Sequence, residues 1–198
     1  MNPLKTICVF CGSSLGVGDT YRLAAAELGG LLAREGIALV YGGAHVGTMG
    51  ALADACLAAQ GTVTGVMPQR LVEREVAHGG LTTLHVVDTM HTRKAMMADM
   101  ADAFIALPGG FGTYDELFEI LTWAQIGMHQ KPVGLLNVGG FYTPLLTFLE
   151  SAVAAGFVQP RHFAMIQVAD TVEALLAKLA TAQASAPVAG KWTVATDA

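Results

Sequence analysis

The stretch that decides the fold runs from Ala103 to Glu116 and reads A-F-I-A-L-P-G-G-F-G-T-Y-D-E. Its first five residues are apolar, as in a strand that is buried on both faces, and the glycines after Pro108 end that strand. A helical pattern follows from Tyr114 to Ile126. A buried strand that passes through glycines into a helix is the repeating unit of parallel α/β sheets.

The same strand–helix unit recurs along the chain. Short β-branched runs predict further strands at 7–10, 38–41, 63–67, 84–87, 133–136 and 165–168. Amphipathic segments predict further helices at 20–35, 48–60, 92–101, 142–155 and 172–182. Repeated βα units of this length predict a Rossmann-like, doubly wound parallel sheet of about seven strands with helices on both faces.

Length and composition bound the organisation of the chain. Its 198 residues suit one nucleotide-binding α/β domain, predicted over residues 1–182, and the Ala-, Ser- and Pro-containing composition of residues 183–198 predicts a loose tail. Apolar residues make up 53% and charged residues only 14%. A single subunit would struggle to cover so much apolar surface, so we expect a homodimer or an assembly of dimers.

Several classes of protein are disfavoured by the sequence. The net charge is −5 without a basic block, which predicts no binding to nucleic acid or to anionic membranes. No window holds the apolar run of about 18 residues that a membrane span needs. The Cys8-x-x-Cys11 spacing lies on a strand, where the two thiols point to opposite faces, and no Cys/His cluster indicates a metal site. Three cysteines form no disulfide framework, so we expect a cytoplasmic protein.

Glycines gather where ligands bind in such sheets, beyond the carboxyl ends of the strands. They include Gly12 after the first strand, Gly42 and Gly43 after the second, and three more at 109, 110 and 112. The loop that holds Gly109 to Gly112 is predicted to bind a phosphate, as a phosphate cradle. Its donors would be backbone N–H groups, the N-terminus of the following helix and the Thr113 hydroxyl. No Walker lysine and no G-x-G-x-x-G fingerprint accompany it, which favours a mononucleotide over a dinucleotide.

Charged side chains flank this cradle. Glu116 is placed in the first helical turn, where the helix dipole favours its carboxylate form, and it can reach a sugar whose phosphate sits on the loop. By position alone, Glu116 could equally well be an acidic residue that only stabilises the N-terminus of the helix. Arg93 and Lys94 stand near the start of another helix, where the helix dipole makes cations unfavourable. Their position therefore predicts an anionic partner, either a ligand or Glu116. Two solvated side chains are the alternative.

Longer motifs resemble a known family. P-G-G-F-G-T-Y-D-E (108–116) and M-H-T-R-K (90–94) resemble the Lonely Guy family of cytokinin-activating phosphoribohydrolases, which older labels called lysine decarboxylases. Further similar stretches are V-F-C-G-S-S (9–14), Y-G-G-A-H-V-G-T-M-G (41–50) and T-W-A-Q-I-G-M-H-Q-K-P-V-G-L-L-N (122–137). The resemblance covers most of the chain, from about residue 7 to 168.

The resemblance implies an enzyme that hydrolyses the N-glycosidic bond of cytokinin riboside 5′-monophosphates, and of AMP, without a metal or organic cofactor. By motif, Arg93 and Glu116 fall on the catalytic pair. Lys94 and the loop residues Gly109, Gly110, Phe111, Gly112, Thr113, Tyr114 and Asp115 fall on substrate-binding positions, as does Glu75. The remaining predicted binding residues are Gly12, Ser13, Gly42, Gly43 and Met90.

Two departures from the family pattern bear on base preference. Ala44 stands where the family usually has a third glycine, and Thr48 stands where it usually has leucine. Ala44 matters only if the backbone needs a positive φ angle, whereas Thr48 could alter the shape of the pocket. Two other functions stay open: a carrier that holds a nucleotide or a phosphorylated cofactor without cleaving it, and a decarboxylase with pyridoxal phosphate on Lys94.

Overall fold

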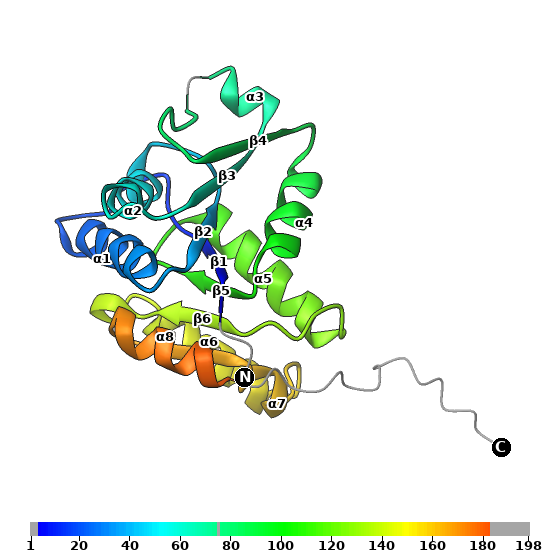
Figure 1. Cartoon of the computed structure of the whole chain (residues 1–198). Coiled ribbons are helices and arrows are strands. Elements are labelled where there is room, and N and C mark those ends of the chain that lie inside the picture. The colour runs from blue at the N-terminus through cyan, green and yellow to red at the C-terminus, as the bar shows by residue number, and fades with distance from the viewer. Residues whose placement is uncertain (1–3, 75, 183–198) are drawn as a thin grey trace.

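The computed structural model describes residues 4–74 and 76–182, and its seven strands form one parallel sheet (Figure 1). The strands are β1 (Thr6–Phe10), β2 (Ala38–Tyr41), β3 (Val63–Pro68), β4 (Thr83–Val87), β5 (Ala103–Ala106), β6 (Val133–Leu136) and β7 (Ile166–Ala169). Their order in the sheet is β4-β3-β2-β1-β5-β6-β7. The predicted fold class is confirmed, and the predicted tail 183–198 lies outside the described residues.

Helices connect the strands. They are α1 (Thr20–Arg34), α2 (Gly47–Ala58), α3 (Gln69–Val72), α4 (Met90–Met100), α5 (Phe111–Gln125), α6 (Thr143–Ala154), α7 (Pro160–Phe163) and α8 (Val172–Thr181), with a short 3-10 helix, η1 (Val138–Gly140). The six longer helices match the predicted ones within a few residues. The single-turn helices α3 and α7 were not predicted, because one helical turn is too short to show a period of 3.6 residues.

The sheet divides the hydrophobic core into two layers. On one face, α1, α2 and α8 pack Leu28, Leu52 and Leu175 against the sheet. On the other face, α4, α5 and α6 supply a second apolar layer that includes Met97 and Leu117. The central strands β1 and β5 are buried on both faces, which explains why their sequences are apolar without alternation.

The order of the strands places the functional crevice. From β1 the chain builds outward through β2, β3 and β4, and then returns to place β5 on the other side of β1. The loops that leave β1 and β5 therefore diverge at a topological switch point. Those two loops hold the predicted glycines Gly12, Gly109 and Gly110, so the sequence and the topology point to the same edge of the sheet.

Candidate active site

A cavity of about 360 Å³ opens at the carboxyl ends of β1, β2 and β3, against the N-terminus of α5. Nine of the predicted site residues line it: Gly12, Ser13, Gly42, Arg93, Gly110, Phe111, Gly112, Thr113 and Glu116. A larger groove of about 440 Å³ runs between α1 and α8, but the only charged residues among its described lining are Glu35 and Glu173. We assign the site to the smaller cavity because polar and charged groups converge there.

Helix α5 begins at Phe111, three residues earlier than predicted, with Gly110 as its N-cap. This shift puts Thr113 in the first turn. Its side chain is buried, and Thr113 Oγ1 has no hydrogen-bond partner among the described residues. A buried hydroxyl without a partner is unfavourable unless a ligand supplies one. Because this hydroxyl lies beside the free N–H groups of the helix N-terminus, the cradle has the donors that an anion needs.

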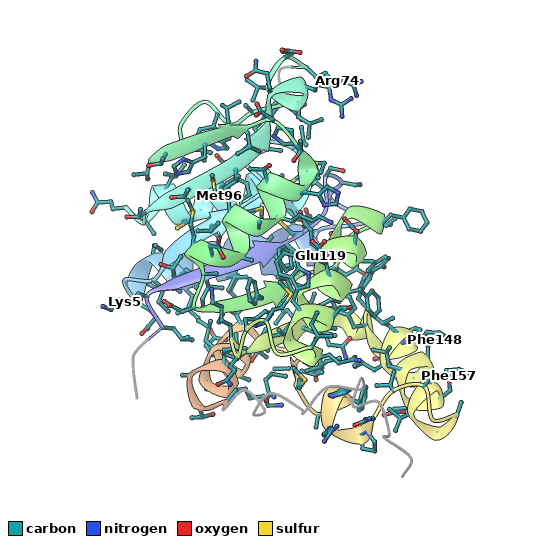
Figure 2. All side chains as sticks on the ribbon, turned by 90° about the vertical axis from the view of Figure 1, so that its right-hand side faces the viewer. Lys5, Arg74, Met96, Glu119, Phe148 and Phe157 are labelled. Atoms are coloured by element: carbon teal, nitrogen blue, oxygen red, sulfur yellow. The ribbon has the colours of Figure 1, made fainter. Side chains whose placement is uncertain are left out.

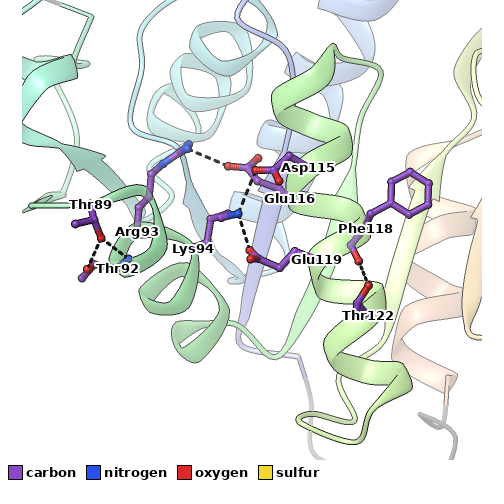
Figure 3. A network of polar contacts seen from close by, with 9 residues as sticks. All are labelled: Thr89, Thr92, Arg93, Lys94, Asp115, Glu116, Phe118, Glu119 and Thr122. Atoms are coloured by element: carbon purple, nitrogen blue, oxygen red, sulfur yellow. Dashed lines mark hydrogen bonds and ion pairs between the residues drawn. The ribbon is translucent and has the colours of Figure 1, made fainter. Parts of the chain in front are cut away.

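Arg93 and Glu116 form a buried ion pair in the wall of the cavity (Figure 3). Arg93 Nη1 lies 3.0 Å from Glu116 Oε1, and the two side chains are 11% and 8% exposed. Arg93 Nε also donates a hydrogen bond of 3.0 Å to the Val66 carbonyl oxygen on β3. The prediction that this cation has an anionic partner is confirmed, and Glu116 is that partner.

Gly42 makes room for the arginine. A Cβ atom at this position would collide with Arg93 Nη2 and would lie 3.3 Å from Met49 Sδ. Since Arg93 is already held by Val66 and Glu116, its guanidinium cannot move away without losing one of these contacts. The glycine that ends β2 is therefore required by the position of Arg93.

Burial raises the pKa of Glu116 above its ordinary value, and the nearby Arg93 guanidinium opposes this shift. This differs from the expectation that the helix dipole would favour the carboxylate. Because α5 begins at Phe111, Glu116 lies in the second turn, beyond the range in which a helix terminus acts strongly. Arg93 is the main group that opposes this rise in the pKa of Glu116.

Lys94 contacts two other carboxylates. Its Nζ atom lies 3.1 Å from Asp115 Oδ2 and 3.0 Å from Glu119 Oε2, both on α5 (Figure 3). Burial tends to lower the pKa of Lys94, but the hydrogen bonds and charges of Glu119 and Asp115 outweigh it and raise the pKa. A Schiff-base lysine needs a neutral amine, so this environment disfavours the decarboxylase alternative.

Not every predicted residue lies in the cavity wall. Gly109 lines an adjoining pocket of about 290 Å³ together with Gly12 and Ser13. Gly43 has a φ angle of +82° and faces Leu84 rather than the cavity. The remaining predicted residues outside the lining are Met90, Lys94, Tyr114 and Asp115. Glu75 lies outside the described residues.

The two departures from the family pattern have a structural explanation. Ala44 lines the cavity but does not have a positive φ angle, so a side chain is tolerated there. Thr48 Oγ1 accepts a hydrogen bond of 2.9 Å from Gly12 N and donates one of 3.1 Å to Gly12 O. Thr48 therefore fixes the loop after β1, and it lines the adjoining pocket rather than the main cavity.

Apolar lining residues were missed by the sequence analysis. They are Cys11, Val46, Met49, Met67, Leu71 and Val76. Apolar side chains carry no chemical signal of their own. One rule could have pointed to the lining residues that follow β1, β2 and β3: the carboxyl ends of neighbouring parallel strands share one edge of the sheet.

The structure bears on two kinds of protein that the sequence disfavours, metal-binding and membrane-spanning proteins. Within residues 4–74 and 76–182, no three His, Cys, Asp or Glu side chains are grouped as metal ligands would be. Over the same residues, no helix has the length and hydropathy to cross a bilayer. Cys8 and Cys11 belong to opposite core layers, as the strand geometry predicted.

Known proteins share both the sequence and the fold. A family model described as "Possible lysine decarboxylase" matches residues 49–179. A protein from Rhodococcoides fascians, named cytokinin riboside 5′-monophosphate phosphoribohydrolase, is 48% identical over 176 residues, 88% of this chain and 89% of that protein. A protein of the same activity name from Oryza sativa subsp. japonica is 49% identical over 175 residues, 88% of this chain and 72% of that protein.

Solved structures show the same architecture. The molybdenum cofactor carrier protein from Chlamydomonas reinhardtii superposes with a TM-score of 0.67 over 87% of this chain and 94% of that one, at 24% identity. At that identity the likeness concerns the fold alone. The much higher identity to the phosphoribohydrolases, over nearly the whole described chain, carries the assignment. This chain belongs to the Lonely Guy family of cytokinin riboside 5′-monophosphate phosphoribohydrolases, and it matches the "Possible lysine decarboxylase" family model.

Proposed function

We propose that this protein hydrolyses the N-glycosidic bond of cytokinin riboside 5′-monophosphates, and of AMP, to the free base and ribose 5-phosphate. The observation that carries the proposal is the buried Arg93–Glu116 pair, which lies in the same cavity wall as the unpartnered Thr113 hydroxyl. The first supplies charges for bond cleavage, and the second supplies a donor for a phosphate. The relatives named for this activity support the same reaction.

Glu116 acts on the ribose. Cleavage of a ribosyl C–N bond builds positive charge on the sugar, as in glycoside hydrolysis, and a carboxylate beside the ring stabilises that charge. The same carboxylate orients the attacking water. The water oxygen bonds to C1′ as the C1′–N bond breaks, and the proton that the water loses ends on the departing base. Burial strengthens these interactions because little solvent is present to screen them.

Arg93 acts through its permanent charge. A guanidinium does not give up a proton readily, so it stabilises negative charge on the departing base and holds Glu116 ionised. Arg93 Nε donates to the Val66 carbonyl oxygen, and Gly42 leaves room for Nη2. The phosphate is bound by the N-terminus of α5 and by Thr113, which places the ribose between the cradle and the ion pair.

An end-point assay tests this function. The protein is incubated separately with AMP and with isopentenyladenosine 5′-monophosphate, and free base and ribose 5-phosphate are quantified by chromatography. Equimolar release of both products from either nucleotide supports the proposal, and the ratio of rates reports the base preference. If the protein binds nucleotide stoichiometrically and releases no free base, the proposal is wrong and the carrier function is favoured instead.

The proposal includes a homodimer, or an assembly of dimers, in the cytoplasm. Phe148 on α6 and Phe157, which follows that helix, project outward and are 63% and 79% exposed (Figure 2). Large apolar side chains at the surface favour contact with a second copy. The three cysteines are free and buried, as suits a reducing compartment. Light scattering at several protein concentrations tests the assembly, and a monomer at all of them would contradict it.

A further inference from the structure

Lys94 and Arg93 are neighbours on α4 but serve different faces of the site. Consecutive helical residues point about 100° apart around the helix axis. Arg93 lies in the cavity wall, and Lys94 does not line the cavity. Lys94 instead reaches across to α5, where it contacts Glu119 (Figure 3). By motif, Arg93 falls on the catalytic pair and Lys94 on a substrate-binding position, but in the structure only Arg93 lines the cavity.

The two carboxylates that receive Lys94 are four residues apart on α5. Asp115 and Glu119 therefore share one helix face, where two like charges repel. The Lys94 ammonium lies within 3.1 Å of both, and its side chain is 11% exposed. Glu116 lies between them in the sequence and turns toward Arg93. Two adjacent sets of ion pairs thus join α4 to α5.

We propose that Lys94 is a positioning residue: by bridging Asp115 and Glu119 it fixes α4 against α5, so that Arg93 Nη1 and Glu116 Oε1 meet. This inference rests on the proposed function for its catalytic consequence. Among the described residues, the ion pairs that join α4 to α5 are Arg93–Glu116 and the two pairs made by Lys94. Lys94 has three N–H donors, and carboxylates of α5 engage two of them.

Lys94 also balances the charges around Glu116. The groups that face this carboxyl are Arg93 and Lys94 from α4, Asp115 and Glu119 from α5, and the Cys8 and Cys11 thiols from the β1 segment. Arg93 and Lys94 lower the pKa of Glu116, whereas Asp115 and Glu119 raise it. Without Lys94, only Arg93 would oppose the effect of Asp115 and Glu119, and the pKa of Glu116 would rise further.

Lys94→Met tests the proposal because it removes the charge and keeps the length of the side chain. The expected result is a fall in kcat of about 10–100-fold with KM nearly unchanged, since a small displacement of reacting groups has an effect of this size. The acid limb of the pH–rate profile should move to higher pH. Lys94→Arg should restore most of the loss, because a guanidinium can still bridge the two carboxylates.

Lys131→Met is the matched control. Lys131 Nζ donates a hydrogen bond of 2.7 Å to the Ala98 carbonyl oxygen, which anchors the other end of α4. This variant loosens the same helix without touching the Lys94 contacts, so kcat and the pH profile should stay unchanged. A raised KM with unchanged kcat in Lys94→Met would overturn the proposal and make Lys94 a substrate-binding residue.

Two NMR measurements test the proposal without an activity assay. In ¹³C-labelled protein, the Glu116 carboxyl resonance should titrate at higher pH in Lys94→Met than in wild type, and the ¹⁵N resonance of Arg93 Nε should shift. Neither should change in Lys131→Met. If the wild type cleaves no nucleotide, the proposed function fails while these two spectra still decide the role of Lys94. Unchanged spectra in Lys94→Met would refute it.

Discussion

The Arg93–Glu116 pair should behave as one catalytic unit. Glu116→Gln removes the charge and keeps an oxygen that can accept from Arg93, and Arg93→Met keeps most of the side-chain volume. Each single variant should lose about 10²–10⁴ in kcat, the usual range for a positioned charged group. The double variant should lose no more than about tenfold beyond the worse single variant, because partners that act together are not additive.

The wild type, the two single variants and the double variant also form a double-mutant cycle for stability. The coupling free energy expected in that cycle follows from the structure. Unit charges 3.0 Å apart attract by about 5 kcal/mol at an effective dielectric constant near 20. Removing both groups from water offsets most of this attraction, so the coupling free energy of unfolding should be about 1–3 kcal/mol. Urea unfolding of the wild type, the two single variants and the double variant measures it.

An exposed pair supplies the control cycle. Arg22 Nε lies 3.0 Å from Asp19 Oδ1, the same distance, but the side chains are 41% and 72% exposed. Arg22→Met and Asp19→Asn should show a coupling of about 0–1 kcal/mol and unchanged turnover. If the losses in kcat for Arg93 and Glu116 instead multiply independently, or if either single variant turns over normally, the reasoning about this unit is wrong.

Three further outcomes follow from the geometry of the site. Gly42→Ala should displace Arg93 and lower kcat by about tenfold or more, whereas Gly79→Ala, with no atom within 4 Å of its added Cβ, should not change kcat. Thr113→Val should raise KM for AMP by about 10–100-fold, the value of a hydrogen bond to a charged group, and Thr113→Ser should restore it. Because burial raises the pKa of Glu116 and the carboxylate is the active form, kcat/KM should fall on the acid side at a higher pH than an ordinary glutamate would give, as a pH–rate profile will show.

The sequence by itself determined the fold class and the edge of the sheet at which the site lies. Apolar strands that end in glycines and lead into helices follow a local pattern, and that pattern is visible without any long-range contact. Arg93 at a helix start, where a cation is unfavourable, was also enough to predict an anionic partner. These features depend on neighbours along the chain or on general rules of parallel sheets.

Only the tertiary structure decided which charge meets which. Arg93 and Lys94 are adjacent in the sequence, yet one binds Glu116 in the cavity wall and the other binds Asp115 and Glu119 outside it. That division depends on how α4 packs against α5. The rise in the pKa of Glu116 likewise depends on burial by elements distant in the sequence, because desolvation is a property of the packed site and not of the residue.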